Sequence, residues 1–323
     1  MYLSYRSVGD MNEALIRSLY KFPHDIDLVV GIPRSGMLPA NLLALYLNKP
    51  FTDIDSFLEG RIYSSGERGA FIDKSKSSKV LLMDDSICSG NALQKAKAKL
   101  SDFTERNPQI KLLFGVVFAT TKSKELVDYF CEIIDGARIF QWNLFHHSGI
   151  IPQSIFDIDG VLCPNPPIDD DGPKYLEYIS NAPILYKPTV KIDQLVSCRL
   201  EKYRKITEKW LSNNGITYNK LTMLNLKTKE ERIAWGKHGE YKGKIYKNSN
   251  DILFVESSLS EAKEIFAISN KPVFCTENFM MINKKPSSNK VKTSIYRKYS
   301  STKLYRGLRK IYHILKKVCN QNS

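Results

Sequence analysis

Two pairs of aspartates follow short apolar segments of this sequence. Asp84 and Asp85 come after "VLLM" and precede the Ser/Gly loop "SICSG", which leads into a helix-like segment. Adjacent carboxylates can accept hydrogen bonds from vicinal hydroxyl groups, and a loop at a helix N-terminus can bind a phosphate through its backbone N–H groups. The pattern indicates a ribose 5-phosphate site, and a helix cap without a ligand is the alternative.

The second pair, Asp157 and Asp159, follows "SIF" and precedes Gly160, which lets the chain turn. Because side chains alternate along an extended chain, both carboxylates are expected on the same side. On its own this pattern is also compatible with a calcium-binding loop or a plain turn.

Strand-like and helix-like segments alternate along most of the 323 residues, which predicts parallel sheets covered by helices. Among them we predict a helix over "MLPANLLALYL", a strand over "SIFDIDGVL", a strand "DQLVS" that ends at Ser197 and a strand "DILFVE" that ends at Glu256. We therefore expect an α/β protein with two parallel-sheet, Rossmann-like domains, over residues 1–148 and 152–283. The join falls near Gly149 and Pro152. The polar stretch between Leu58 and Lys79 is too long for an idle connection and is a candidate lid.

The net charge of +14 is concentrated in residues 284–323, a segment without acidic residues. It holds 12 of the 48 basic residues, which leaves 36 against 34 acidic residues elsewhere. Leu304, Leu308, Ile311 and Leu315 follow helical spacing, opposite basic side chains. We predict a basic amphipathic helix on an anionic membrane surface; a disordered solvated tail or a nucleic-acid contact is the alternative.

The cellular setting follows from what the chain lacks. The N-terminus has no apolar signal core, and no apolar run approaches the roughly 20 residues that would span a bilayer. The six cysteines lie far apart, which favours a reducing compartment. We expect a cytoplasmic protein held peripherally on the inner face of the membrane.

Residues 80–93 resemble the phosphoribosyl pyrophosphate motif of type I phosphoribosyltransferases, and "VVGIPRSGMLPA", residues 29–40, resembles that family's pyrophosphate loop. The resemblance covers about residues 10–145. It implies Mg²⁺-dependent transfer from phosphoribosyl pyrophosphate, with Asp84 and Asp85 on the ribose hydroxyls. The implied donor-binding residues are Arg34, Ser35 and Gly36 at the pyrophosphate and Ser86, Ile87, Cys88, Ser89 and Gly90 around the 5-phosphate.

Two features of this first region leave its chemistry open. Asn91 and Ala92 stand where the family commonly has Gly and Thr, so one phosphate-binding hydroxyl is missing. Trp142 is either a platform for a sugar or a packed core residue. The remaining candidates are Arg61, Arg68 and Lys74, which could close over the leaving group, and His146 and His147, which either accept a proton or only form a linker.

The segment around Asp157 resembles motif one of the haloacid dehalogenase superfamily, and the other motifs follow in order. The resemblance implies Asp157 as nucleophile, Asp159 as general acid and base, and Mg²⁺ bound by Asp157, Asp159 and Glu256. Ser197 and a lysine would hold the phosphoryl group. Lys242 is assigned, with Lys244 as competitor, and Ser257 stands where a second acid is common. Motifs about 40 residues apart leave no room for a large cap, so an open phosphatase site is expected.

The order of the two sites suggests a sequence of reactions. Ribosyl transfer leaves a 5-phosphate, which a phosphatase would remove. The pairing resembles the modules that install ribofuranose in bacterial capsules and O antigens. We expect a lipid-linked glycan acceptor.

Two other functions are weighed against this one. One is a nucleobase- or orotate-like phosphoribosyltransferase fused to a nucleotidase. The other is a non-catalytic ribose-phosphate sensor that binds nucleic acid, which the intact Asp157, Asp159 and Ser197 argue against. A nucleic-acid partner is therefore not expected, and a homo-oligomer is left open.

Overall fold

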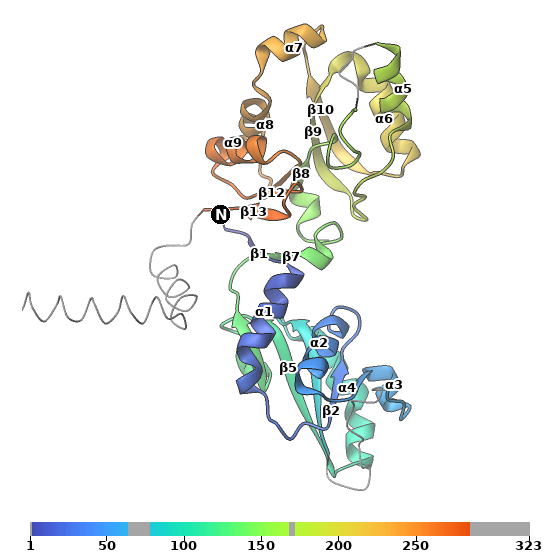
Figure 1. Cartoon of the computed structure of the whole chain (residues 1–323), viewed down its shortest axis with the longest axis vertical. Helices are drawn as coiled ribbons and strands as arrows, with labels where there is room; N and C mark the ends of the chain where they lie inside the picture. Colours follow the sequence, from blue (N-terminus) through green and yellow to red (C-terminus); the bar gives the residue numbers. More distant parts are fainter. Residues whose placement is uncertain (1, 64–77, 168–171, 285–323) are drawn as a thin grey trace, which may run out of the picture. The chain divides into compact units, whose positions relative to one another are not determined.

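The computed structural model describes residues 2–63, 78–167 and 172–284 (Figure 1). Within this part, residues before about 135 form a five-stranded sheet in the order β3-β2-β4-β5-β6, with every neighbouring pair parallel. Its strands are β2 Leu28–Gly31, β3 Phe51–Asp53, β4 Ser78–Ser86, β5 Ile110–Ala119 and β6 Tyr129–Ile133.

Helices cover both faces of this sheet. The helices α1 (Val8–Ser18) and α2 (Met37–Leu47) share one hydrophobic cluster with inward side chains of β2 and β4, such as Val29 and Leu81. The helices α3 (Ile54–Leu58) and α4 (Asn91–Arg106) pack in a second cluster on the other face. Because both faces are buried, β4 is nearly continuously apolar, as the sequence predicts.

A second sheet has six strands in the order β10-β9-β8-β11-β12-β13, and only β13 is antiparallel to its neighbour. Its strands are β8 Ser154–Phe156, β9 Ile192–Leu200, β10 Tyr218–Leu224, β11 Leu253–Glu256, β12 Val273–Cys275 and β13 Met280–Ile282. A separate two-stranded parallel pair joins β1 (Ser4–Arg6) to β7 (Arg138–Phe140).

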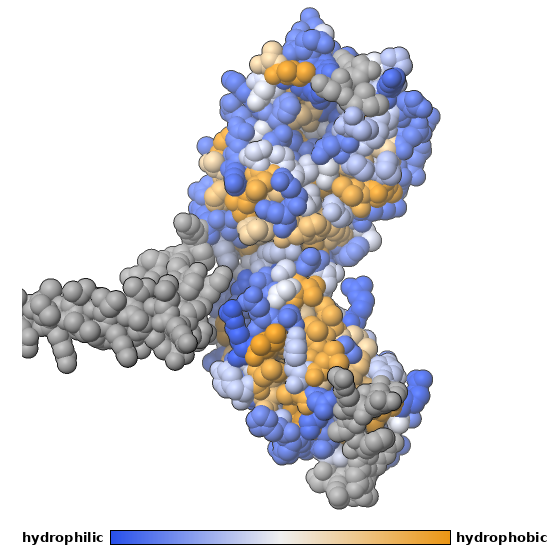
Figure 2. Space-filling model, in the orientation of Figure 1, coloured by the Kyte–Doolittle hydropathy of each residue, from blue (hydrophilic) through white to orange (hydrophobic). Residues whose placement is uncertain are grey.

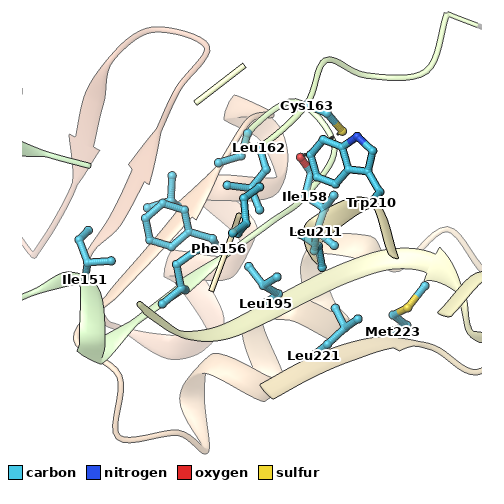
Figure 3. Close-up of a cluster of buried hydrophobic side chains, with 14 of the residues drawn as sticks. Ile151, Phe156, Ile158, Leu162, Cys163, Leu195, Trp210, Leu211, Leu221 and Met223 are labelled. Atoms are coloured by element: carbon cyan, nitrogen blue, oxygen red, sulfur yellow. Dashed lines mark hydrogen bonds between the residues drawn. The ribbon is translucent and has the colours of Figure 1, made fainter. Parts of the chain in front are cut away.

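The second sheet is also sandwiched between helices. Figure 3 shows one of its cores, in which Trp210 and Leu211 of α6 (Arg204–Asn213) belong to the same hydrophobic cluster as Phe156 and Leu195. The helix α5 (Pro173–Asn181) joins this core. On the other face, α8 (His238–Lys247) and α9 (Leu259–Ser269) form another cluster, and α7 (Lys229–Trp235) precedes α8.

Both sheets have a point at which the strand order reverses. From β2 the chain moves outward to β3 and returns past β2 to β4; from β8 it moves outward to β9 and β10 and returns to β11. Open parallel sheets bind ligands at such points, beside the carboxyl ends of the strands. Asp84 and Asp85 lie at the end of β4, and Asp157 and Glu256 lie at the ends of β8 and β11. The topology alone thus singles out both aspartate pairs.

The predicted α/β class with parallel sheets is confirmed, and α2 has the predicted bounds. Two predicted elements differ from the structure. The strand expected over "SIFDIDGVL" ends at Phe156, so Asp157 and Asp159 lie in the loop behind β8. The strand expected to end at Ser197 continues to Leu200. The predictions did not include α1, α3, α5, α7 and α8.

Several predictions concern parts that the structure does not test. The described residues up to Ile282 form one compact unit. The proposed boundary between residues 148 and 152 therefore stays a prediction. Arg68, Lys74 and the predicted helix beyond Lys284 lie outside the described residues. Among those described, no helix is long and apolar enough to cross a membrane.

The helix α2 carries apolar side chains on its solvent side as well as on its sheet side. Leu45 is 70% exposed, and Leu38 and Tyr46 are also exposed. Figure 2 shows hydrophobic residues gathered over α2. Residue hydrophobicity therefore does not tell which side of α2 faces the sheet.

Gly36 provides a test of how tightly the first loop sits on β4. A Cβ atom there would lie 2.5 Å from the carbonyl oxygens of Ile32 and Met83 and 2.8 Å from Cα of Asp84. Backbone atoms cannot move aside as a side chain can, so Gly36→Ala should destabilise the fold by about 1–3 kcal/mol. Gly9→Ala, in α1, is the control, because a Cβ atom there meets only an ordinary van der Waals contact with Ser7 Oγ at 3.5 Å. Thermal unfolding should show a lower melting temperature for Gly36→Ala alone; equal melting temperatures would contradict the tight approach.

Candidate functional sites

The first site centres on Asp85, which is buried at the end of β4. Its Oδ1 accepts a hydrogen bond from the Ser35 hydroxyl (2.9 Å), and its Oδ2 accepts one from Trp142 Nε1 (2.7 Å). Ser35 and Asp85 were both predicted to bind the donor, and the structure brings them together. Trp142 stacks on Phe140 with ring centroids 4.7 Å apart. Trp142 therefore holds Asp85 from one side, with its ring packed on Phe140.

Asp84 lies beside Asp85 and accepts a hydrogen bond from the Asp85 backbone N–H (2.8 Å). Burial, and after it the charge of Asp85, raise the pKa of Asp84 to about 8. A ligand that donates hydrogen bonds, or a cation, would stabilise the ionised form of these two adjacent carboxylates. Vicinal hydroxyl groups and Mg²⁺ are both of that kind.

The loop behind Asp85 borders a cavity of about 210 Å³. Gly90 has a positive φ of 82° and caps the N-terminus of α4, where backbone N–H groups are left without helical partners. All five residues predicted for the 5-phosphate, residues 86–90, line this cavity. The lining residues include Asp84, Ser86, Ile87, Cys88, Ser89, Gly90, Asn91, Ala92 and Arg138.

Other residues predicted for this site have more ordinary surroundings. Arg34 is exposed in the loop after β2. Arg61 pairs with Glu59 on the surface. His146 shares a hydrogen bond with the Thr189 hydroxyl (2.8 Å), and His147 Nδ1 accepts one from the Gly149 N–H (3.2 Å). These histidine contacts fit the linker interpretation of residues 146 and 147.

The second site is built around the ammonium group of Lys242, on α8. Its Nζ lies 2.6 Å from Asp157 Oδ2, 2.8 Å from Glu256 Oε2 and 2.8 Å from Glu261 Oε2. The Lys242 side chain is 4% exposed, whereas Lys244 is 65% exposed and pairs with Glu240. Of the two lysines, the structure places Lys242 with Asp157.

Three carboxylates around one ammonium group, two of them buried and that of Glu261 partly exposed, leave an excess of negative charge. Burial raises the pKa of Asp157 to about 8, although Lys242 acts in the opposite direction. Burial also acts to raise the pKa of Glu261, but a hydrogen bond with His238 and the charge of Lys242 outweigh it and lower that pKa to about 2. The ion cluster thus distinguishes the two carboxyl groups.

Asp159 is held apart from this cluster by Arg199. The Nε and Nη2 atoms of Arg199 donate to the Asp159 carboxylate at 2.9 and 2.7 Å, and the arginine is 1% exposed. Such a two-point contact fixes the plane of the carboxylate. Asp159 was also predicted as a metal ligand, but its side chain faces the guanidinium group instead of Lys242.

Ser197 and Ser257 differ in part from the predictions. The Ser197 hydroxyl is buried and accepts a hydrogen bond from the Arg199 backbone N–H (3.1 Å), while its neighbour Cys198 lines the cavity. The Ser257 hydroxyl donates to the Asp159 carbonyl (3.1 Å) and lies where a Cβ on Gly160 would be. Glu261, five residues after Glu256, adds a further carboxylate that contacts Lys242.

The cavity beside these groups has a volume of about 450 Å³. Sequence reasoning did not identify four of the polar residues in or beside it. Arg232 of α7 and His238 of α8 line it, and each has a buried nitrogen without a hydrogen-bond partner in the described residues. Glu261 also lines it, and Arg199 acts through Asp159. Only Glu261 had a usable signal, as an acid in the first turn of a helix that follows a site strand.

Mg²⁺ was predicted at this second site. No group of three or more His, Cys, Asp or Glu side chains in residues 2–63, 78–167 and 172–284 has the arrangement of a metal site. The donors still fit the ion in kind, because Asp157, Glu256 and Glu261 present oxygen atoms, which Mg²⁺ prefers. The three negative charges exceed the single positive charge of Lys242, so a divalent cation would bring the cluster closer to neutrality.

Comparison with known proteins adds a limited likeness. No family model and no curated protein sequence matches this chain. Among solved structures, a xanthine-guanine-hypoxanthine phosphoribosyltransferase of Helicobacter pylori is 19% identical, with a TM-score of 0.33, over 44% of this chain and 93% of that one.

Two further solved structures give similar values. A purine phosphoribosyltransferase of Pyrococcus horikoshii is 16% identical, with a TM-score of 0.33, over 44% of this chain and 94% of that one. An orotate phosphoribosyltransferase of Aeropyrum pernix is 17% identical, with a TM-score of 0.27, over 38% and 69%. At such identities and scores, the likeness alone assigns neither a fold nor an activity.

The ion cluster makes Lys242 necessary for stability. Lys242→Met leaves the buried Asp157 and Glu256 and the partly exposed Glu261 without their cation, and breaking a buried ion cluster typically costs about 3–5 kcal/mol. Lys244→Met, two residues away, removes an exposed pair and should change stability by less than about 1 kcal/mol. Urea unfolding at pH 8 without divalent cations should separate the two variants. Equal stabilities would contradict the buried cluster.

Proposed function

We propose that this chain is a bifunctional enzyme. Its first site transfers a 5-phosphoribosyl group from phosphoribosyl pyrophosphate to a glycan hydroxyl and releases pyrophosphate. Its second site hydrolyses the 5-phosphate and leaves β-ribofuranose on the glycan. The observation that carries the proposal is the presence, in one chain, of two carboxylate sites at the reversal points of two parallel sheets.

At the first site, each group has a role that matches its surroundings. Asp84 and Asp85 accept hydrogen bonds from the ribose 2- and 3-hydroxyls, and residues 86–90 receive the 5-phosphate at the N-terminus of α4. Ser35 and Trp142 keep Asp85 in position. The C1–O bond to pyrophosphate breaks, the acceptor oxygen bonds to C1 from the opposite face, and the proton of the acceptor hydroxyl passes to solvent water. Catalysis is then mainly positioning and electrostatic stabilisation.

At the second site, Asp157 attacks the phosphorus atom and forms an aspartyl-phosphate while the ribose 5-oxygen leaves. Asp159, oriented by Arg199, donates a proton to that oxygen and then takes one from the water that releases inorganic phosphate. Lys242 neutralises the incoming phosphoryl oxygens. Asp157, Glu256 and Glu261 would hold Mg²⁺, which supplies charge neutralisation and makes the phosphorus more electrophilic.

The acceptor distinguishes this proposal from its main alternative. A nucleobase- or orotate-like phosphoribosyltransferase joined to a nucleotidase would use the same two sites. In salvage of bases, however, a phosphatase would at once undo the gain of a nucleotide. On a glycan, removal of the phosphate makes the addition effectively irreversible. Parallel assays with nucleobases, orotate and lipid-linked glycans as acceptors separate the two functions.

The two activities should be separable by mutation, because each has its own site. Asp157→Asn should keep transfer and accumulate a product that carries a 5-phosphate. Asp84→Asn with Asp85→Asn should lose transfer but still hydrolyse a surrogate phosphomonoester. Mass spectrometry of the acceptor product and phosphate release give the two measurements. Loss of both activities in either variant would point to one shared site and contradict the scheme.

Arg199 provides a test of the role given to Asp159. Arg199→Lys keeps the charge but loses the two-point contact, so hydrolysis of ribose 5-phosphate should fall about 100-fold. Hydrolysis of p-nitrophenyl phosphate, whose leaving group needs little protonation, should fall much less. Arg204→Lys is the control. It removes the guanidinium contacts of Arg204, at the start of α6, with Glu201 and Glu208. Equal losses on both substrates would rule out positioning of the acid.

A further inference from the structure

Arg138 at the start of β7 lies beside the loop of the first site, although the two are 51 residues apart in sequence. Its Nη2 donates to the Ile87 carbonyl at 2.7 Å, in the middle of the loop. Its guanidinium carbon also lies 5.9 Å from the centre of the Phe140 ring. One contact therefore holds the guanidinium group against the loop, and the other lies within β7.

The other terminal nitrogen of Arg138 is unsatisfied. Among the described residues, Nη1 is buried and has no hydrogen-bond partner. Buried polar groups are nearly always hydrogen-bonded, so such a donor calls for an acceptor that binds there. Arg138 borders the 210 Å³ cavity, and an oxygen atom of a ligand in that cavity is a suitable acceptor.

The charges around the cavity indicate the kind of ligand. Of its described lining residues, Arg138 is the only one with a positive side chain, and Asp84 is the only one with a negative side chain. The loop adds the Ser86 and Ser89 hydroxyls and the N-terminus of α4, which also favour an anion. A guanidinium group beside these donors suits a phosphate dianion.

We propose that Arg138 is a ligand of the substrate's phosphate monoester in this cavity. The proposal rests on the transfer function proposed above and adds to it a cation that no motif contains. It also accounts for how a loop with Asn91 and Ala92 after Gly90 can still hold a 5-phosphate. The guanidinium group would take the place of a side-chain hydroxyl and add a full positive charge.

Cys88 allows binding to be measured at this cavity alone. Its thiol is exposed and it lines the cavity, so a bound phosphate should slow its alkylation by iodoacetamide. The full-length chain with Asp157→Asn is the parent, because it should not hydrolyse the probe. Alkylation of the Cys88 peptide is followed by mass spectrometry against increasing ribose 5-phosphate, and in parallel against pyrophosphate, which lacks the ribose end. The same titration with phosphoribosyl pyrophosphate and Mg²⁺ tests the donor itself.

Arg138→Met should weaken protection by ribose 5-phosphate about 10-fold or more, because a charge-assisted hydrogen bond is lost. Arg138→Lys, which keeps the charge but not the fork of donors, should lie in between. Arg106→Met, an exposed position at the end of α4, should behave as the parent. Protection by pyrophosphate should be unchanged in all variants.

Unchanged protection by ribose 5-phosphate in Arg138→Met would overturn the inference, as would an equal loss of protection by pyrophosphate. A failure of the proposed transfer function looks different. In that case ribose 5-phosphate would protect Cys88 of the parent, and Arg138→Met would weaken that protection. Phosphoribosyl pyrophosphate with Mg²⁺ would not protect Cys88. Absence of protection by any probe would reject both proposals.

Discussion

Buried carboxylates placed next to one another are the feature on which both sites depend. Burial raises the pKa of Asp84 and of Asp157 to about 8 in each case, so the ionised form of each group is disfavoured unless a cation or a hydrogen-bond donor lies beside it. The two sites compensate the charge of these carboxylates in different ways. Lys242 compensates part of the charge around Asp157, whereas Asp85 is surrounded by the neutral donors of Ser35 and Trp142. Ligands that bring cations or hydroxyl donors would complete each site.

The strand order determines where these groups meet. A parallel sheet places the carboxyl ends of its strands at one edge, and a reversal of strand order opens a crevice between two crossovers. In the first sheet this brings the loop after β2 to the end of β4, where Gly36 packs on the backbone of Asp84. In the second it brings Asp157, after β8, beside Glu256, at the end of β11. The same construction thus positions both groups of carboxylates.

The sequence predicted those parts that local patterns encode. The apolar runs of β4 and β11, the helix α2 and the aspartates behind the strands could be recognised because each lies within a few residues of its signal. Partners brought together by the fold could not. Arg199 is 40 residues from Asp159, and Arg138 is 51 residues from Ile87. Lys242 and Lys244 could not be separated from the sequence, because only the packing of α8 shows which of them is buried.

The central claim is that transfer and hydrolysis occur in series on one substrate. The most direct measurement uses phosphoribosyl pyrophosphate with one isotope label on the 5-phosphate and another on the pyrophosphate, incubated with the enzyme, Mg²⁺ and a glycan acceptor. The account predicts that labelled pyrophosphate appears first. The 5-phosphate label should pass through the glycan product and then appear as inorganic phosphate in equal amount. Release of the 5-phosphate label without an acceptor, or its permanent retention on the product, would contradict the account.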